Sequence, residues 1–388
     1  MKLPLPAIAA HWNLLRRDIT FLNHGSFGAC PQPVFETYQR WQRELEMQPV
    51  EFIARRQNGL LAEARMALGA YLGVAGDDLI FAPNVTHALN IVAHSLRLEP
   101  GDEVLGNDHE YGAIERVWRY HTERQGAHYV NCQLPLPLHD PQQIVDTLWA
   151  HVTPRTRVIA VSHITSPTAL IFPVTEICRR ARAAGIITVV DGAHAPGQIA
   201  LDAAAIDADF YGGNCHKWLC APKSAGFLYA RPEHQAALEP LVVSWGWRAR
   251  VPGGALFREH FDYTGTSDVA AYLSVPAAIA FQHEHDWPAV RAACHALLRD
   301  ARGRVAALTG LPPICPDDAA WFGQVAALPL PAAVEPHLAR LCPEFGIEIP
   351  TYRWNEHLFA RVSIQAYNTP ADVDRLVAAV AQMMPQAV

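Results

Sequence analysis

Residues 186–218 read IITVVDGAHAPGQIALDAAAIDADFYGGNCHKW, and they are the most informative part of the chain for its fold. Its β-branched run from Ile186 to Val190 is typical of a buried strand, and the run ends on a carboxylate, Asp191. A second short strand follows and leads to Lys217, which lies 26 residues after Asp191. The sequence therefore predicts an acid and a lysine at the ends of two neighbouring strands.

An acid and a lysine in these two places are what pyridoxal phosphate (PLP) requires from a protein. The carboxylate keeps the pyridine nitrogen protonated, and the lysine forms a Schiff base and later moves protons at the substrate Cα. Simpler interpretations are a surface charge for Lys217 and a helix cap for Asp191. However, Lys217 follows an apolar strand and precedes Trp218-Leu219, so desolvation is expected to lower its pKa. We expect Lys217 to carry PLP and Asp191 to face the ring nitrogen.

Helical and strand periods alternate along the chain, which predicts an α/β fold with a mostly parallel sheet. Helices are expected at 33–72 (with a break near Pro49), 86–96, 113–125, 174–184 and 370–384. Strands are expected at 78–81, 103–105, 158–161, 186–190, 225–229 and 321–328.

Half of the 388 residues are hydrophobic, which is enough for a large core and two domains. A Pro-Gly-Gly at 252–254 and a polar loop at 263–267 indicate a boundary. We expect a large PLP-binding domain at 22–260 and a smaller C-terminal α+β domain at 261–388, with an N-terminal segment, 1–21, packed on the small domain.

The overall charge and the cysteines exclude several classes of protein. A net charge of −7 without a run of five like charges gives no basis for binding nucleic acid or an anionic membrane. The apolar stretch 319–334 contains two prolines and suits a core strand better than a membrane span. Eight cysteines without a CxxC pair, and no secretory signal, predict reduced thiols and a cytoplasmic protein. His283-Glu284-His285 lacks the spacing of a metal helix, so no metal is expected.

A phosphate group requires backbone amides at the start of a helix. The stretch 81–87, FAPNVTH, reads as strand, turn and helix, with Thr86 as the helix cap. The amides of Val85 and Thr86, the Thr86 hydroxyl and the preceding Asn84 are the expected phosphate cradle. Asn214 is a second candidate for the phosphate, and His216 would reach the phosphate or the ring edge.

Three further side chains have expected roles and simpler alternatives. His194, three residues after Asp191, is expected near the phenolic oxygen of PLP, although it could be a polar turn residue. Tyr111 follows the strand at 103–105 and could stack on the ring or simply pack. Arg361 lies on a predicted strand between apolar residues, where it could bind a substrate carboxylate or form a structural ion pair.

Four segments carry a closer resemblance: Phe21–Gly28 (FLNHGSFG), Asp108–Ala113 (DHEYGA), Ser162–Ser166 (SHITS) and Asn214–Trp218 (NCHKW). With these motifs the chain resembles the class V aminotransferase-fold, or fold-type I, PLP-dependent enzymes, and within them the isopenicillin N epimerase-like branch. The resemblance covers most of the chain.

The resemblance implies a homodimer with shared active sites. Thr266, in a Gly-Thr loop of the neighbouring chain, would reach the phosphate. Asn23 and His24 would line the substrate entrance, and Thr165 or Ser166 would lie near the phenolic oxygen. The stretch 350–356, where desulfurases carry a persulfide-forming cysteine, has none, which argues against sulfur relay.

The implied activity is chemistry at the Cα of a small amino acid or a related substrate, through an external aldimine, as in an epimerase or racemase. Epimerisation needs a second acid, for which His24 and Tyr352 are candidates. The alternatives are a β-eliminating C–S lyase, an aminotransferase and a cysteine desulfurase. A non-enzymatic PLP-fold binding protein is also an alternative. Such a protein would be expected to lack the lysine, whereas this chain has Lys217.

Overall fold

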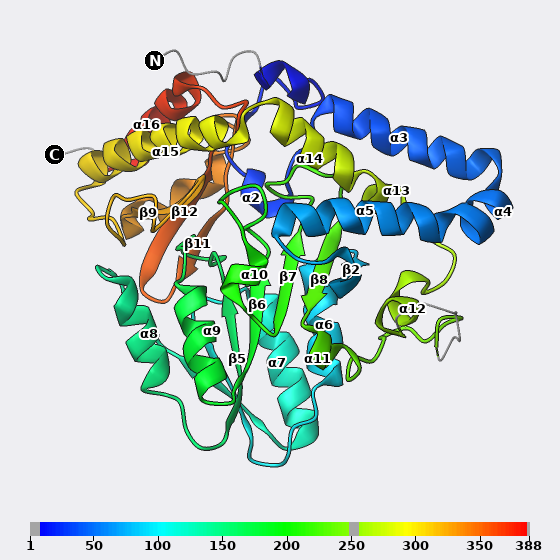
Figure 1. Cartoon of the computed structure of the whole chain (residues 1–388). Helices are drawn as coiled ribbons and strands as arrows, with labels where there is room; N and C mark the ends of the chain where they lie inside the picture. The colour runs from blue at the N-terminus through cyan, green and yellow to red at the C-terminus, as the bar shows by residue number, and fades with distance from the viewer. Residues whose placement is uncertain (1–7, 248–255, 386–388) are drawn as a thin grey trace.

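The centre of the molecule is a seven-stranded sheet with the strand order β2-β8-β7-β6-β5-β3-β4 (Figure 1). The computed structural model describes residues 8–247 and 256–385. The strands of the sheet are β2 (Leu79–Ala82), β3 (Glu103–Asn107), β4 (His128–Cys132), β5 (Thr156–Ser162), β6 (Ile187–Gly192), β7 (Phe210–Asn214) and β8 (Gly226–Ala230). β8 pairs antiparallel with β2 and β7 and the other four strand pairs are parallel, so the predicted mostly parallel sheet is confirmed.

The register of the central strands brings their ends together. Ser162, at the end of β5, pairs with Asp191 of β6, and Asp191 pairs with Gly212 of β7. Nearly every residue of these strands is buried, as their β-branched sequence predicts. Because parallel strands end at the same edge, side chains that follow β5, β6 and β7 meet there, at the edge where α/β folds bind ligands.

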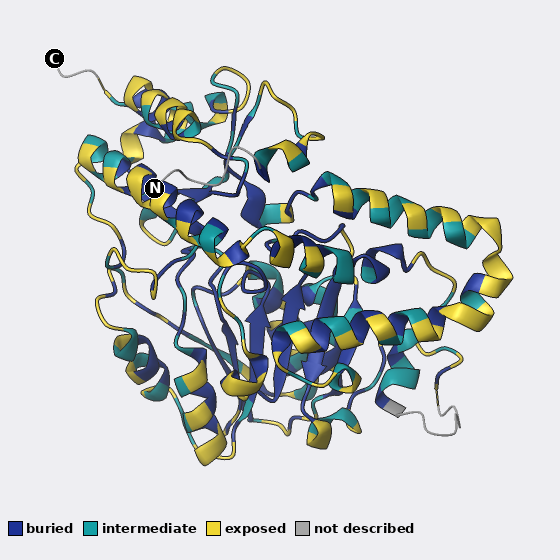
Figure 2. Ribbon diagram, turned by 45° about the horizontal axis from the view of Figure 1, so that its top comes forward, coloured by how far each residue is buried: buried dark blue, intermediate teal, exposed yellow. Residues whose placement is uncertain are grey.

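Helices cover both faces of the sheet. The helices are α2 (His24–Phe27), α3 (Gln32–Met47), α4 (Pro49–Glu51), α5 (Gln57–Leu72), α6 (Val85–Ser95), α7 (Gly112–Gln125), α8 (Pro141–Trp149), α9 (Val174–Ala183), α10 (Ala203–Ile206), α11 (Pro232–Gln235), α12 (Leu256–Asp262), α13 (Ala270–Leu273), α14 (Val275–Glu284), α15 (Trp287–Thr309) and α16 (Pro370–Met383). One face of the sheet packs on α6, α7 and α12, and the other on α5, α8 and α9. Figure 2 shows the resulting burial of the strands, with exposed residues on the outer sides of the helices.

The strand residues alternate between these two layers. Val104, Val158 and Val189 face the first core, whereas the next residue of each strand faces the second. This alternation follows from the two-residue period of a strand. It explains why the central strands read as continuous apolar runs.

The C-terminal third forms a smaller domain. Its sheet has the order β11-β12-β9, with β9 (Val325–Leu330), β11 (Thr351–Trp354) and β12 (His357–Ser363), and α15 and α16 pack beside it (Figure 1). Near the start of the chain, β1 (Thr20–Phe21) pairs with β10 (Ile347–Glu348) of this third. The Pro-Gly-Gly at 252–254, on which the expected boundary partly rests, lies outside the described residues.

Most predicted elements are confirmed, with small shifts at their ends. The expected break near Pro49 lies between α3 and α4, and a short π-helical segment, Phe52–Arg56, joins α4 to α5. The strand predicted at 321–328 begins later, at Val325. No helix in the described ranges has both the length and the apolar character that a membrane crossing requires.

Candidate active site

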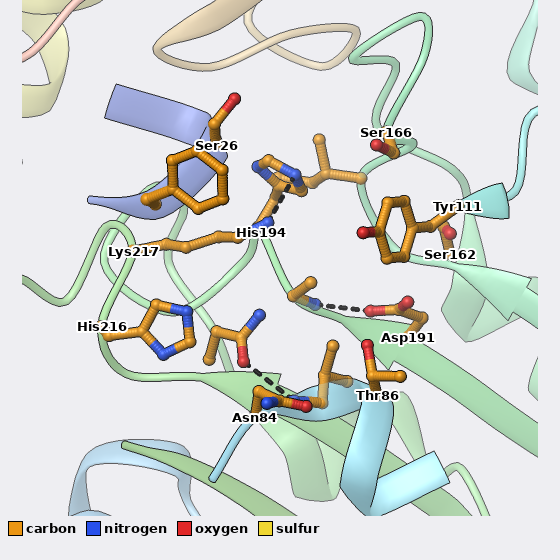
Figure 3. A pocket seen from close by; sticks show the side chains of 15 residues that line it. Ser26, Asn84, Thr86, Tyr111, Ser162, Ser166, Asp191, His194, His216 and Lys217 are labelled. Carbon is orange, nitrogen blue, oxygen red and sulfur yellow. Dashed lines mark hydrogen bonds between the residues drawn. The ribbon is translucent and has the colours of Figure 1, made fainter. Parts of the chain in front are cut away.

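Ten of the fifteen predicted site residues line one pocket at the carboxyl edge of the sheet (Figure 3). They come from segments at the ends of β2, β3, β5, β6 and β7, which the sheet register gathers at this edge. Asn23, His24, Thr165, Thr266 and Arg361 do not line the pocket. The sheet topology therefore brings most of the predicted site residues together in one pocket.

Asp191 and Lys217 both contribute to this pocket. Asp191 is 3% exposed, and its Oδ1 accepts a hydrogen bond of 2.8 Å from the Ala193 amide. Burial raises the pKa of Asp191, and the Lys217 charge opposes this shift. Burial, together with the positive charge of Arg361, lowers the pKa of Lys217 to about 7, against the opposing effect of Asp191. A neutral amine is therefore available near neutral pH.

His194 lies between the lysine and the protein interior. Its Nε2 is 3.1 Å from Lys217 Nζ, and its Nδ1 accepts a hydrogen bond of 3.2 Å from the indole N–H of Trp218. Burial lowers the pKa of His194 well below its ordinary value, and the positive charges of Lys217 and Arg361 act in the same direction. The ring is therefore a neutral imidazole with one nitrogen directed at the lysine.

The start of α6 offers an anion site that differs in detail from the prediction. Asn84, not Thr86, caps the helix, because its side chain accepts a hydrogen bond of 2.9 Å from the amide of His87. The Val85 amide donates to Asn214 Oδ1 at 2.9 Å, so this amide and this oxygen already have partners. Thr86 lines the pocket with an amide and a hydroxyl that have no partner among the described residues.

His216 and Tyr111 complete the walls of the pocket. His216 Nδ1 is 3.1 Å from the carbonyl oxygen of Ala225, and burial lowers the pKa of His216 to about 4. Tyr111 precedes α7 and is 46% exposed. Figure 3 shows Tyr111 and Lys217 on opposite sides of the pocket.

Glu110 is a functional candidate to which the sequence analysis assigned no role. Its carboxylate accepts hydrogen bonds from the Ser162 amide (3.0 Å), the Ser162 hydroxyl (2.6 Å) and the Asn107 side chain. Burial raises the pKa of Glu110 to about 8, and the nearby charge of Asp191 adds to the shift. A neutral Glu110 beside Asp191 favours the ionised form of Asp191. An acid three residues after the buried strand β3 was the available signal, although it is weaker than that of Asp191, which lies at the end of β6 itself.

Arg361 reaches the rim of the pocket from β12. Its guanidinium donates to the Ser166 carbonyl oxygen at 2.6 Å and to the Ser26 hydroxyl at 3.1 Å. Arg361 is 8% exposed, its Nε has no hydrogen-bond partner, and no carboxylate pairs with it among the described residues. A buried cation without a counter-charge is costly, so the structural ion pair is not the explanation of this residue.

Asn23 and His24, which were expected to line the substrate entrance, do not line this pocket. His24 is fully buried, with Nδ1 3.0 Å from the Tyr367 hydroxyl and Nε2 3.0 Å from the Lys217 carbonyl oxygen. The Asn23 side chain bonds to Glu348 and Ser26 instead. Ser26 and Phe27, in the same short helix α2 as His24, line the pocket. A helix of four residues has no periodicity from which its pocket-facing side could be predicted.

Three other predicted side chains do not face this pocket. Thr165 is buried, and its hydroxyl bonds to Thr168 and to the Leu170 amide, so only Ser166 of the predicted pair lines the pocket. Thr266 is exposed, and its hydroxyl is 3.3 Å from the Tyr263 hydroxyl. Tyr352 donates to the Pro167 carbonyl oxygen, and burial raises the pKa of Tyr352 to about 12. Tyr352 and His24 are therefore poor candidates for a second acid.

The residues present fit PLP. The pocket combines an unpartnered amide and hydroxyl at a helix start, a buried carboxylate and a lysine with a lowered pKa. These groups match a phosphate, a pyridine nitrogen and an aldehyde, respectively. No group of three or more potential metal ligands occurs in the described ranges, 8–247 and 256–385.

Comparison with known proteins identifies relatives along most of the chain. The model of the class-V aminotransferase family matches residues 29–376. The isopenicillin N epimerase of Amycolatopsis lactamdurans is 36% identical over 379 residues, which are 94% of this chain and 95% of that protein. The isopenicillin N epimerase of Streptomyces clavuligerus is 37% identical and covers 94% of each chain. A probable chloroplastic L-cysteine desulfhydrase of Arabidopsis thaliana is 28% identical over 92% of this chain and 82% of its own.

Solved structures confirm the expected fold. A cysteine desulfurase from Escherichia coli superposes with a TM-score of 0.82 at 24% identity, covering 98% of both chains. The cystine C–S lyase C-DES superposes with a TM-score of 0.81 at 21% identity, covering 95% of this chain and 99% of its own. The relatives reported above are all named as enzymes, so the non-enzymatic alternative has no support. The chain belongs to the class-V aminotransferase family, the PLP-dependent enzymes of fold type I that its motifs resemble.

Proposed function

We propose that the protein is a PLP-dependent enzyme that epimerises a small amino acid, or an amino-acid-derived substrate, at its Cα. One observation carries the proposal: a lysine with a lowered pKa and a buried carboxylate line one pocket, and an arginine without a counter-charge bonds to two residues of its wall, Ser166 and Ser26. The similarity to two isopenicillin N epimerases supports epimerisation among the reactions that this set of groups allows.

The chain's own residues would hold the cofactor in a defined orientation. The Thr86 amide and hydroxyl, with His216 and the Asn214 amide group, would bind the phosphate, and Lys217 would attach the aldehyde carbon. Asp191 would hold a proton on the ring nitrogen, His194 and Ser166 would lie near the phenolic oxygen, and Tyr111 would cover one ring face. When bound, the cofactor supplies an electron sink that makes a bond at the substrate Cα labile.

Lys217 and Arg361 would act on different groups of the substrate. Arg361 would bind the α-carboxylate with its forked guanidinium, which fixes the bond at Cα that is broken. Lys217, neutral near pH 7, would remove the Cα proton. Arg361 is 8% exposed, and this burial would strengthen its interaction with a carboxylate.

Epimerisation also requires proton delivery to the opposite face of Cα. Tyr111 is the candidate, because its ring lies across the pocket from Lys217 and its hydroxyl belongs to an exposed side chain (Figure 3). Tyr111→Phe is expected to leave proton removal by Lys217 intact and to slow racemisation by about 10²-fold or more.

Incubation in D₂O with the L and D forms of candidate amino acids tests the proposal. We expect deuterium at Cα and conversion between the two forms. The Tyr111→Phe variant should still exchange the proton of one enantiomer without inverting it. Formation of pyruvate without any D-isomer would reject epimerisation.

The second candidate function is β-elimination by a C–S lyase. Similarity to a probable L-cysteine desulfhydrase over most of the chain favours it. The same lysine, carboxylate and arginine serve this reaction, and the missing cysteine at 350–356 removes only the persulfide relay of a desulfurase. Cysteine or cystine that yields pyruvate and a sulfur product, while other amino acids are not inverted, would establish this alternative.

We further propose a homodimer in which Thr266 serves the pocket of the neighbouring chain. Thr266 is exposed and remote from its own pocket, and the large apolar side chains of Val243 and Trp245 are 63% and 87% exposed. Trp245→Glu is expected to weaken the dimer in sedimentation experiments; an unchanged dimer would argue against this interface.

The domain division at residue 260 and a cytoplasmic location are likewise proposed. The pairing of β1 with β10 supports placing 1–21 on the small domain. All eight cysteines are free, which fits a reducing compartment.

A further inference from the structure

Trp218 has a contact that the proposed reaction does not yet explain. Its indole N–H donates a hydrogen bond of 3.2 Å to Nδ1 of His194, and Nε2 of the same ring is 3.1 Å from Lys217 Nζ. An indole nitrogen is only a donor, so Nδ1 must be the acceptor. A neutral imidazole with an acceptor at Nδ1 carries its hydrogen at Nε2.

We propose that Trp218 is a positioning residue that fixes the tautomer of His194, so that Nε2–H points at Lys217 and into the pocket. This tautomer makes Nε2 a permanent donor and Lys217 Nζ its acceptor. A protonated amine has only donors and would oppose Nε2–H. Trp218 therefore favours the neutral form of Lys217 through His194. This role rests on the proposed function of Lys217, but it is testable in protein without cofactor.

The indole cannot easily turn away from this contact. Trp218 is fully buried and packs with Ala169 and Val325, and its ring lies 5.0 Å from the ring of His24. The Trp218 carbonyl oxygen accepts a hydrogen bond of 2.8 Å from Gln282. Both the ring and the backbone of Trp218 are thus held by surrounding residues.

Gly25 shows how closely the two rings are packed. A Cβ at Gly25 would lie 3.3 Å from the indole and 3.5 Å from Cε1 of His194, and 2.9 Å from the Ser363 hydroxyl. A larger residue at this position would therefore press on both rings. The close approach of α2 keeps the donor and the acceptor in register.

The charged groups around His194 favour its neutral form. Lys217, Arg361, His216 and His24 come from three segments, and each of them lowers the pKa of His194 in addition to burial. A charged imidazolium would need hydrogen on both nitrogens and would lose the Trp218 bond. Electrostatics and hydrogen bonding thus require the same tautomer.

The nitrogen-15 chemical shifts of histidine side chains in cofactor-free protein test the tautomer. The resonances that disappear in His194→Gln identify the ring. We expect the wild-type shifts of a neutral ring with hydrogen on Nε2, and a change toward the other tautomer or a mixture in Trp218→Phe. Hydrogen on Nδ1 in the wild-type protein would overturn the proposal, whether or not any variant folds.

The reactivity of Lys217 tests the consequence. In cofactor-free protein, reductive methylation of Lys217, followed by mass spectrometry against pH, reports its neutral fraction. Loss of the Trp218 bond should slow labelling at neutral pH by about three- to tenfold, which corresponds to one hydrogen bond.

Trp287→Phe is the matched control, because Trp287 is also buried and its N–H donates to a carbonyl oxygen, that of Gly197, at 2.8 Å. The control should leave the Lys217 profile unchanged. If Trp218→Phe does not fold, 3-benzothienylalanine at position 218 keeps the bicyclic shape without the N–H. If labelling of Lys217 against pH is equal in this protein and the wild type, the proposal is overturned. The outcome of this experiment does not depend on which reaction is catalysed.

Discussion

His24 and His194 are two buried histidines that contact opposite parts of the same residue, Lys217. His24, in α2, has its Nε2 3.0 Å from the Lys217 carbonyl oxygen, whereas His194, after β6, has its Nε2 3.1 Å from the Lys217 amine. Burial is the largest cause of the lowered pKa of both rings. Only His194 lines the pocket.

Residue type, burial and nearness to the lysine are therefore not sufficient to identify a catalytic histidine. The two histidines differ in the hydrogen-bond partner of their other ring nitrogen, Nδ1. The other nitrogen of His24 bonds to Tyr367, which ties α2 to the small domain, and that of His194 bonds to Trp218, which leaves Nε2 directed at the amine. The first ring connects α2 to the small domain, and we propose that the second acts on the lysine.

The largest effect is expected from Lys217→Ala, which removes the partner of His194 and keeps that of His24. Activity should fall by about 10³-fold or more, because the general base is lost, and the visible absorption band of the attached cofactor should disappear. Absorption spectra after addition of PLP check this. A band of wild-type strength in the variant would show that another amine carries the cofactor.

The next effect is expected from His24 in acid, through stability. The pKa of His24 is lowered to about 3 in the folded protein, so the unfolded chain binds the additional proton first as pH falls below about 6.5. The stabilising contribution of His24 is complete above pH 6.5 and is lost progressively toward pH 3, at up to ~1.4 kcal/mol per pH unit. Denaturant unfolding at several pH values should show a flatter acid slope for His24→Gln than for the wild type.

At neutral pH, His24→Gln should act on stability and hardly on the chemistry. It leaves the Tyr367 hydroxyl and the Lys217 carbonyl oxygen imperfectly bonded, which is expected to cost about 2 kcal/mol of unfolding free energy. The visible band of the cofactor should remain. Loss of the band at unchanged stability would contradict the structural role of His24.

The smallest effect is expected from His194→Gln. In contrast to His24→Gln, it should change the pKa of Lys217. Glutamine offers both a donor and an acceptor to Lys217, so the amine is no longer confined to its neutral form. Its pKa should rise from about 7 by a fraction of a unit to one unit, seen in the pH profile of Lys217 labelling. A profile equal to that of the wild type would remove the distinction between the two histidines.

From the amino-acid sequence we could predict most strands and helices of the large domain, the acid and the lysine at neighbouring strand ends, and the family, but not the strand at 128–132 or the long helix Trp287–Thr309. These features are local or periodic: a β-branched run predicts a strand, and parallel strands end at one edge. Even the helix start at 84–86 was identified, although the cap is Asn84 and the Val85 amide bonds to Asn214.

Tertiary structure alone decided which neighbours face the pocket. Ser26 and Phe27 replaced Asn23 and His24 there, Glu110 bonded to Ser162, and Trp218 bonded to His194. These contacts join segments far apart in the chain, and each depends on which side of a short helix or turn packs inward. Spacing along a sequence places a residue at a strand end, but the direction of its side chain is set by the residues packed around it.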